Sequence, residues 1–414
     1  MEALYSGGLI FDGERLLENH GVMVKGGRIV RLAPSTEFVG FTGKHVDTTG
    51  QTVLPGLIDC HIHICIGAEA DLVAVLGQLS ESELAVRAME NAQSTLRGGV
   101  TSARDLGGKS FVEITVRDAI NAGRCLGPTL MCAGQLICMT GGHGSWLGTE
   151  ADGAEEIVRA VRNNIKAGAD LIKVIATGGV LTPNVDPMQA HFDKAELCAA
   201  VYESHRFDRR ITAHALGAPG ISNAVEAGID SIEHGFQITD ELVSEMVSKG
   251  IVLVPTISAL QEIVQNAKSG IPDYAFEKAS RFCEMHRSSI REFHAAGGTI
   301  AMGTDAGTPF NYHGNNVHEL GYMVDYGLSP LEALQAATKH SGDLCNLSDR
   351  GLVREGYWAD LLIVSGNPVQ DISAVSRGEN HVRVVKEGFD VFDHLGPYIA
   401  DGRAQRFIHD EPSF

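Results

Sequence analysis

The stretch Leu57-Ile-Asp-Cys-His-Ile-His63, directly after the turn Leu54-Pro-Gly56, constrains the fold of this chain more than any other segment. Its two histidines alternate with apolar residues. Because a β-strand repeats every two residues, this spacing predicts a buried strand on which His61 and His63 point the same way. Two imidazoles on one face, at the C-terminal end of a strand, form half of a metal site. The other half has to come from elsewhere in the chain.

Short apolar runs alternate with helical patterns from residue 57 to about residue 345. The predicted strands are Leu57–His63, Val100–Asp105, Thr129–Ala133, Leu171–Ala176, Arg210–His214, Ser231–His234, Val252–Thr256 and Thr299–Asp305. Segments rich in Ala, Glu and Arg, such as Ser80–Arg97, lie between them. Eight strands alternating with helices predict an α/β fold, a (β/α)₈ TIM barrel, which carries its chemistry at the C-terminal ends of its strands.

The two ends of the chain, residues 1–56 and 346–414, have a different pattern. Near the start, short alternating strands separated by glycine pairs such as Gly26-Gly27 predict hairpins. Near the end, Trp358–Val364 and Val382–Lys386 are strand-like. Since chain termini often lie close together, we expect both ends to form one small β-sandwich domain beside a barrel of residues 57–345.

Charge and composition exclude several classes of partner. The chain has 414 residues and a formal charge of −19, from 33 basic and 52 acidic residues. Phosphate contacts need clustered Lys and Arg, so we expect no nucleic-acid partner. No apolar stretch is long enough to span a membrane, and we expect no secretory signal. The eight cysteines form no CxxC pair, which favours buried, reduced thiols in a cytoplasmic protein. We also expect a homo-oligomer.

Further metal-ligand types stand at the C-terminal ends of later predicted strands. His214 and His234 end the fifth and sixth strands, and Asp305 ends the eighth. Imidazole and carboxylate are the ordinary ligands of Zn²⁺ and its neighbours. Chance would scatter such residues over strands, helices and loops. Their shared position therefore favours a metal site over a purely structural role.

Lys173 lies within the almost wholly apolar run Leu171–Ala176. A charged ammonium there is costly unless it is paired, and it has no lone pair for a metal. One interpretation is a lysine whose head reaches solvent or pairs with an acid. The other is a carbamylated lysine, because burial favours the neutral amine that reacts with CO₂. The two oxygens of a carbamate can bridge two cations.

These residues together resemble the binuclear pattern of the amidohydrolase superfamily, with HxH on strand one, Lys on strand four, His on strands five and six and Asp on strand eight. The flanking segments Leu54–His63, Thr140–Gly144, Ile175–Gly179 and Gly303–Gly307 are similar to its imidazolonepropionase-like branch. Within that branch they resemble bacterial metallo-dipeptidases and carboxypeptidases that cut Xaa-Pro, Xaa-Arg or Xaa-Lys dipeptides. Imidazolonepropionase itself uses one metal and lacks the bridging lysine, so Lys173 argues against that activity.

The resemblance implies an enzyme that acts on C–N (peptide) bonds of a small-molecule substrate with two divalent metal ions, expected to be Zn²⁺. By that resemblance His61, His63 and Asp305 bind one ion, His214 and His234 bind the other, and carbamylated Lys173 and a hydroxide bridge them. The hydroxide attacks the amide, and Asp305 takes its proton and passes it to the leaving amine.

Loop residues are predicted to contact the substrate. The resemblance gives His143, in the glycine-rich loop after strand three, a catalytic contact with the substrate carbonyl or carboxylate. Gly178 and Gly179 predict a close backbone approach after strand four. Tyr312 and His313 follow the Asp305 strand and are further candidates, although loop structure alone also explains them.

The expected function is hydrolysis of the amide bond of a dipeptide or an N-acyl amino acid. Hydrolysis of a cyclic amide or another carboxamide is the alternative within the superfamily. A non-catalytic barrel that binds small ligands is the alternative of another class, and the complete ligand set counts against it. Arg104 and Asp105 end strand two, and we interpret them as a buried ion pair; the alternative is that Arg104 anchors a substrate carboxylate.

Overall fold

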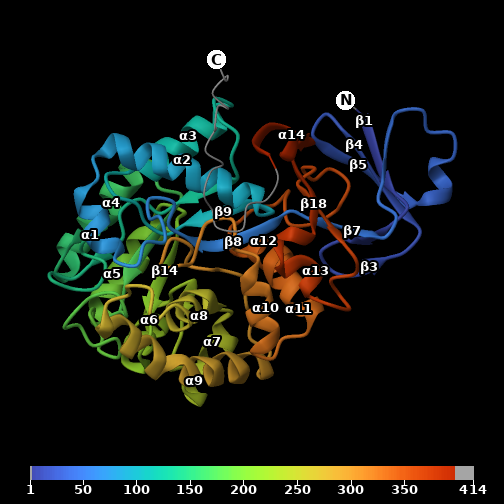
Figure 1. The fold of residues 1–414 in the computed structure, drawn as a ribbon. Coiled ribbons are helices and arrows are strands. Elements are labelled where there is room, and N and C mark those ends of the chain that lie inside the picture. Colours follow the sequence, from blue (N-terminus) through green and yellow to red (C-terminus); the bar gives the residue numbers. More distant parts are fainter. Residues whose placement is uncertain (1, 397–414) are drawn as a thin grey trace.

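The computed structural model describes residues 2–396, in which the strands of the middle part run parallel in two sheets (Figure 1). The first sheet has the order β10-β9-β8, with β8 (Leu57–Ile62), β9 (Val100–Asp105) and β10 (Thr129–Cys132). The second has the order β12-β11-β13-β14-β15-β16, with β11 (Ile137–Cys138), β12 (Thr149–Glu150), β13 (Leu171–Ile175), β14 (Arg210–Ala215), β15 (Ser231–His234) and β16 (Val252–Val254). Strands such as β8 and β13 are buried at every position, as expected for parallel strands covered on both faces.

The eighth predicted strand, Thr299–Asp305, does not form a regular strand. Its backbone nevertheless bonds to β16 through Leu253, and to the other sheet through Cys60 of β8. A side chain at Gly303 would lie 2.3 Å from Val254 and 2.9 Å from His61, so only glycine lets this segment fit between β16 and β8. The segment therefore connects the far edges of the two sheets.

Helices follow most of these strands and surround the sheets (Figure 1). They are α1 (Leu72–Gln78), α2 (Glu81–Arg97), α3 (Val112–Asn121), α4 (Gly153–Ala167), α5 (Lys194–Arg206), α6 (Ala218–Ala227), α7 (Asp240–Lys249), α8 (Ile257–Gln265), α9 (Asp273–Ala295), α10 (His318–Asp325), α11 (Pro330–Gln335), α12 (Ser341–Leu344), α13 (Ser373–Ser376) and α14 (Phe392–Leu395). Capping boxes begin α2, where Ser80 and Glu83 bond reciprocally, and α5, where Asp193 and Glu196 do so. No helix between residues 2 and 396 combines the length and the apolar character needed to cross a membrane.

The two chain ends contribute strands to one sheet, as predicted. That sheet has the order β19-β18-β17-β7-β2-β3, with β2 (Leu9–Phe11), β3 (Leu16–Leu17), β7 (Gln51–Pro55), β17 (Leu361–Ser365), β18 (His381–Lys386) and β19 (Phe389–Asp390). A second sheet, β5-β4-β1-β6, contains β1 (Glu2–Ser6), β4 (His20–Lys25), β5 (Arg28–Pro34) and β6 (Lys44–Asp47). One apolar cluster holds side chains from both, including Val22, Ile29, Val53 and Ile363. That these sheets form a separate sandwich domain, bounded at residues 56 and 346, stays a prediction.

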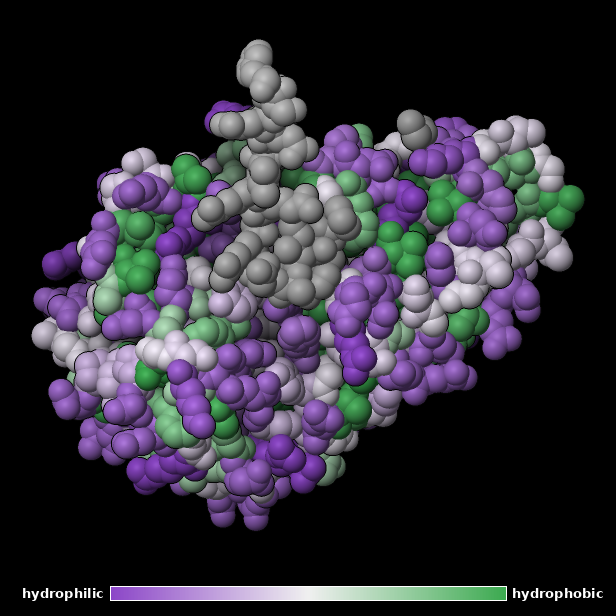
Figure 2. All heavy atoms as spheres, in the orientation of Figure 1, coloured by the Kyte–Doolittle hydropathy of each residue, from purple (hydrophilic) through white to green (hydrophobic). Residues whose placement is uncertain are grey.

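The outer surface is mixed in character. On the face in Figure 2, apolar residues are scattered among polar ones. The most exposed large apolar side chains in the described part of the chain lie in separate helices, strands or turns; they are Val39, Tyr202, Phe389 and Val86. Isolated apolar side chains of this kind are normal on a protein surface.

Candidate metal centre and active site

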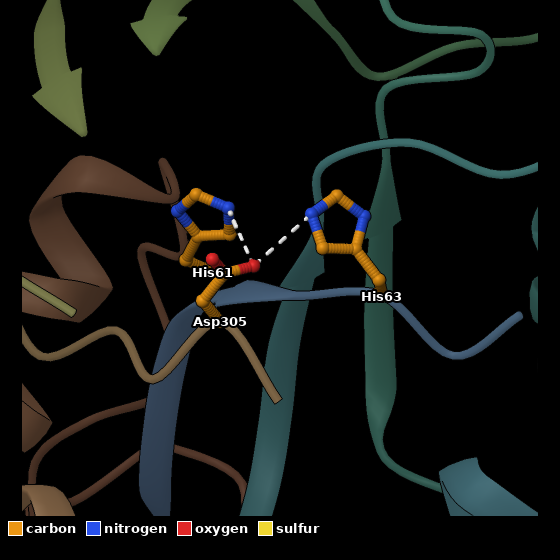
Figure 3. Close-up of side chains that lie close together, drawn as sticks. All are labelled: His61, His63 and Asp305. Atoms are coloured by element: carbon orange, nitrogen blue, oxygen red, sulfur yellow. Dashed lines mark ion pairs between the residues drawn. The ribbon is translucent and has the colours of Figure 1, made fainter. Parts of the chain in front are cut away.

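His61 and His63, at the end of β8, turn toward one carboxylate, that of Asp305 (Figure 3). Oδ1 of Asp305 lies 3.4 Å from Nε2 of His61 and 3.3 Å from Nε2 of His63. The three ligand atoms lie within 4.8 Å of one another, so they can reach one metal ion.

Two more histidines extend this group along the neighbouring strands. The ring centroid of His234, at the end of β15, lies 5.1 Å from that of His61 and 4.5 Å from that of His214 on β14. The four histidines line one pocket with Lys173 of β13 and Asp305. The structure thus brings all six predicted metal ligands around the same pocket.

Each of the four imidazoles uses one ring nitrogen for a contact with the protein. Nδ1 of His61 lies 2.8 Å from Oε2 of Glu233, Nδ1 of His63 lies 2.9 Å from the carbonyl oxygen of Gly107, Nε2 of His214 lies 2.9 Å from that of Gly178, and Nδ1 of His234 lies 2.7 Å from Oγ1 of Thr256. The Thr256 hydroxyl donates its own proton to the carbonyl oxygen of Pro255, so it accepts from His234. Since all four partners accept, the contacting nitrogen carries the proton. The other nitrogen keeps its lone pair for a metal.

The charge states of these residues also suit a metal. Burial lowers the pKa of His61, His214 and His234 well below its usual value, so these rings are neutral. Burial alone would raise the pKa of Asp305, but the neighbouring His61, His63 and Lys173 lower it to about 2. Burial lowers the pKa of His63, but the contact with Asp305 outweighs it, so the pKa of His63 is raised. An ionised carboxylate therefore faces a neutral His61 ring and a more basic His63 ring.

Lys173 is 2% exposed, and within residues 2–396 its ammonium has no hydrogen bond or ion pair. Burial lowers the pKa of Lys173 to about 8, although the charges of Glu233 and Asp305 oppose that change. A head group that reaches solvent does not agree with this burial. A lysine that is buried, unpaired and readily deprotonated has the properties that carbamylation requires.

Glu233, adjacent to His234, is a supporting residue that the sequence analysis missed. Its side chain is fully buried, and Oε2 accepts the Nδ1 proton of His61. Oε1 accepts from Arg104 at 2.6 Å and also from the Thr212 hydroxyl. A carboxylate behind a ligating imidazole fixes the orientation of the ring and raises its basicity. The sequence feature that could have identified Glu233 is an acidic residue within an apolar predicted strand, directly before a predicted ligand.

The predicted ion pair between Arg104 and Asp105 is wrong. The Arg104 guanidinium binds Glu233 and, at 2.6 Å, the carbonyl oxygen of Cys60. Asp105 instead accepts the backbone N–H groups of Ile64 and Gly107. Successive residues of a strand point to opposite faces, so Arg104 and Asp105 cannot face each other. Arg104 also does not line the pocket.

His143, in the loop between β11 and β12, lines the pocket beside the metal ligands. Its ring centroid lies 4.6 Å from that of His214, and its Nδ1 lies 2.8 Å from Oγ1 of Thr182. Burial, assisted by His191, lowers the pKa of His143 to about 3, so the ring is neutral. Its Nε2 has no partner among the described residues and is available to a bound molecule.

The other predicted substrate contacts lie outside the pocket lining. Gly178 binds His214 through its carbonyl oxygen, and a side chain at Gly179 would come within 2.4 Å of the His143 ring. His313 is buried, with Nε2 3.2 Å from the carbonyl oxygen of His63. These contacts favour supporting roles for Gly178, Gly179 and His313, and nothing brings Tyr312 to the pocket wall.

The remaining pocket wall is largely apolar. Its apolar members are Ile66, Leu136, Trp146, Leu147, Ile175, Val180, Leu181, Leu216, Phe236, Ala259, Leu260 and Ile263. Among the described residues, Lys173 and Asp305 are the only Lys, Arg, Asp or Glu side chains in the lining. The Nε1 atom of Trp146 is buried without a hydrogen-bond partner, which is unusual for a polar atom and leaves a donor at the wall.

Three residues beside the pocket have a left-handed backbone. φ is 72° at His234, 51° at Thr256 and 59° at Asp305. Asp and His are among the few residues other than glycine that adopt this region with some frequency. β15 ends at His234, β16 ends two residues before Thr256, and Asp305 is the last residue of the irregular segment 299–305.

Comparison with known proteins agrees with this geometry. A model of the amidohydrolase family matches residues 52–391. An ochratoxinase from Aspergillus niger is 31% identical over 452 residues, which cover 97% of this chain and 88% of that protein. A crystal structure of a Xaa-Pro dipeptidase with bound methionine has a TM-score of 0.87 and 31% identity, covering 94% of this chain and 99% of that chain. A prolidase complexed with N-methylphosphonate-L-proline has a TM-score of 0.86 and 28% identity, with the same coverage.

These relatives imply a TIM-barrel fold for the middle part of the chain. They also support a hydrolase that acts on amide bonds, which removes the alternative of a non-catalytic barrel. The cluster of His61, His63 and Asp305 fits the metal ions that the family generally uses. By its sequence and its fold, the chain belongs to the amidohydrolase family.

Proposed function

We propose that this protein hydrolyses the amide bond of a dipeptide or an N-acyl amino acid, using two divalent metal ions and a carbamylated Lys173. The observation that carries the proposal is the set of four imidazoles, each with one nitrogen bound to the protein and the other available, around a pocket with Lys173 and Asp305. A dipeptidase, a prolidase and an ochratoxinase among its relatives support this substrate class. The cytoplasmic location and the homo-oligomer stay predictions.

The donor set fits a pair of ions better than a single one. His61, His63 and Asp305 would hold one ion, His214 and His234 the other, and a carbamate on Lys173 would reach both. Neutral imidazoles and carboxylate-like oxygens are typical Zn²⁺ ligands, so Zn²⁺ is the expected metal. When bound, the ions would lower the pKa of water and polarise the substrate carbonyl.

The chain's own residues would move protons and hold the substrate. Asp305 is ionised and faces the pocket, so it can accept a proton and pass it to the leaving amine. His143 presents its Nε2, and Trp146 presents an indole N–H without a partner. Trp146 is available as a donor to the substrate carbonyl or carboxylate, and so is His143 when the Thr182 hydroxyl donates to its Nδ1. The pocket lining of the described chain contains no Arg for this role.

The pocket wall favours an apolar group on the substrate. Burying a Leu- or Phe-sized group against residues such as Leu136, Phe236 and Leu260 is worth roughly 1.5–3 kcal/mol. The basic side chain of an Xaa-Arg or Xaa-Lys dipeptide would need an acidic partner there. Among residues 2–396, Asp305 is the only acid of the lining, and it would serve the metal site. Within the predicted range, we therefore favour N-acyl amino acids and dipeptides with apolar side chains.

The test compares Xaa-Pro, Xaa-Arg, Xaa-Lys, apolar dipeptides and N-acyl derivatives of apolar amino acids on the full chain loaded with Zn²⁺. Release of the C-terminal amino acid and bound zinc are both measured. We expect about two zinc ions per chain and fastest release from apolar substrates. Full metal content without turnover of any of these substrates would refute the proposed reaction. If a cyclic amide is cleaved and none of these substrates is, the alternative of cyclic-amide hydrolysis would be favoured.

A further inference from the structure

One segment of the pocket wall, residues 178–185, follows β13 and touches several parts of the site. Its Val180 and Leu181 line the pocket. Gly178 accepts from Nε2 of His214, and Gly179 lies directly against the ring of His143. Thr182 binds Nδ1 of His143 through its hydroxyl at 2.8 Å. This single segment therefore contacts two imidazoles and forms part of the apolar wall.

Lys278 of α9 holds this wall segment from outside. Its Nζ lies 2.7 Å from the carbonyl oxygens of Thr182 and Val185 and 3.3 Å from that of Gly179. An ammonium has three N–H donors, and three carbonyls of one segment accept them. Four residues earlier on α9, the Tyr274 hydroxyl donates to the carbonyl oxygen of Leu181 at 3.2 Å.

The partners of Lys278 distinguish it from most lysines on the surface. Within residues 2–396 it has no ion pair with a carboxylate. Its half-buried ammonium binds three backbone carbonyls and lies 5.6 Å from the ring centroid of Tyr274. Such an arrangement defines the path of a loop, because the three bonds form only when the three carbonyls converge. Lys278 itself does not line the pocket, so any influence on substrate has to pass through the wall segment.

We propose that Lys278 is a positioning residue for hydrolysis: by binding three carbonyls of residues 178–185, it holds Thr182 against His143 and sets the apolar wall at Val180 and Leu181. The inference rests on the proposed function for its effect on turnover. Its structural part, the link from α9 through the wall segment to His143, is independent of which substrate is cleaved.

The experiment compares Lys278→Met with Lys249→Met in the full-length, zinc-loaded protein. Methionine keeps an unbranched stem and removes the donors. Lys249 is the control, because its Nζ also donates to a backbone carbonyl, that of Val225 at 2.9 Å, but away from the pocket. Unlike Lys278, it also pairs with a carboxylate, that of Glu245. The measurements are kcat and KM for the best substrate, bound zinc, and amide hydrogen exchange of residues 178–185.

We expect Lys278→Met to lower kcat/KM by about 10–100-fold with both zinc ions retained, since a small misplacement of a positioning group has effects of this order. Exchange of residues 178–185 should become faster. Lys249→Met should change neither. Thr182→Val should act through the same link, so the double variant with Lys278→Met should be much less impaired than the product of the two single effects.

Two results would overturn the proposal. Either the exchange of residues 178–185 and kcat/KM are the same for Lys278→Met and Lys249→Met, or the effects of Lys278→Met and Thr182→Val multiply as for independent sites. If the wild type cleaves no substrate, the proposed function fails, and hydrogen exchange alone decides whether Lys278 holds the wall segment.

Discussion

Within residues 2–396, two buried lysines lie on strands, and they differ in what surrounds the ammonium. Lys173 of β13 is 2% exposed and Lys386 of β18 is 5% exposed. Nζ of Lys386 lies 2.9 Å from Oδ2 of Asp360 and 2.8 Å from Oγ1 of Thr129. Nζ of Lys173 has no such partner in the described chain. Burial lowers the pKa of both lysines; Asp360 opposes this change at Lys386, and Glu233 and Asp305 oppose it at Lys173.

The contrast extends to the groups around each lysine. Asp360 also binds Arg350 and the backbone N–H of Glu387, so the charges near Lys386 satisfy one another. Around Lys173, His61 and His234 keep one nitrogen uncommitted. A network in which every charged group has a partner serves the fold, whereas a network with unpaired groups can still bind a ligand. This difference supports the assignment of Lys173, and not Lys386, to the metal site.

The largest expected effect is on activity, which should depend on the groups around Lys173 and not on those around Lys386. Asp305→Asn should lower kcat by about 10²–10⁴-fold, because the amide cannot take up a proton as the carboxylate does. Asn also tolerates the left-handed backbone of this position, so the fold and most of the metal should remain. Asp360→Asn should affect stability and leave kcat nearly unchanged. Steady-state kinetics with zinc analysis test both, and a near-normal rate for Asp305→Asn would exclude the proton-transfer role.

The free energy of unfolding should fall when a group around Lys386 is removed and not when Lys173 is removed, which is the opposite of what we expect for activity. Lys386→Met removes one of the two buried cations that pair with Asp360, and Arg350 remains. The free energy of unfolding should therefore fall, but by less than the roughly 3–5 kcal/mol of a fully uncompensated buried charge. In metal-free protein, Lys173→Met removes a buried charge that has no partner, so stability should not fall. Urea unfolding in the presence of a chelator measures both. Equal losses in the two variants would mean that the two environments do not differ as described.

The pH dependence of stability should sharpen the same comparison. The pKa of Lys173 is lowered from 10.5 to about 8 in the folded protein, so between these values the unfolded chain binds more protons. Stability of metal-free wild type, measured against Lys173→Met in CO₂-free buffer, should therefore rise by about 3 kcal/mol from pH 8 to above pH 10. Below pH 8 the difference should be flat. A difference that stays constant throughout would contradict the low pKa of Lys173.

The smallest expected effect concerns the groups behind the ligands. Thr256→Val removes the acceptor for Nδ1 of His234, which should weaken the binding of one metal ion by about 10–100-fold. Thr338→Val is the control, because Thr338 is also buried and its hydroxyl donates to a helix carbonyl away from the pocket. Competition with a zinc chelator gives both affinities. Equal affinities in the two variants would show that Thr256 does not hold the ring.

Local sequence pattern was sufficient for the strands that carry the ligands. Seven predicted strands agree with observed ones within two residues, because buried parallel strands such as β13 are continuous apolar runs. The eighth is irregular because Gly303 fits between neighbouring strands and Asp305 adopts a left-handed backbone. The short strands β11 and β12 had too few residues to form a recognisable pattern.

The partners behind the ligands could not be predicted in the same way. Arg104 and Glu233 are 129 residues apart in sequence and lie on different strands, so no local residue spacing predicts their contact. His313 follows the predicted ligand Asp305, yet its ring faces the carbonyl oxygens of His63 and Ile66. Which loop residues reach a pocket depends on the path of each loop, and contacts between distant residues decide that path. The contacts from Lys278 to Thr182 and from Thr182 to His143 are an example.

The left-handed backbones at His234 and Asp305 restrict how this centre can be altered. Each of these residues is a proposed metal ligand and also shapes a bend of the backbone beside the pocket. Replacing either by a longer or branched donor would lose the bend together with the atom, at a cost of about 1–3 kcal/mol for an ill-fitting backbone. A redesign for a different ion therefore has to rebuild two bends as well as the coordination sphere.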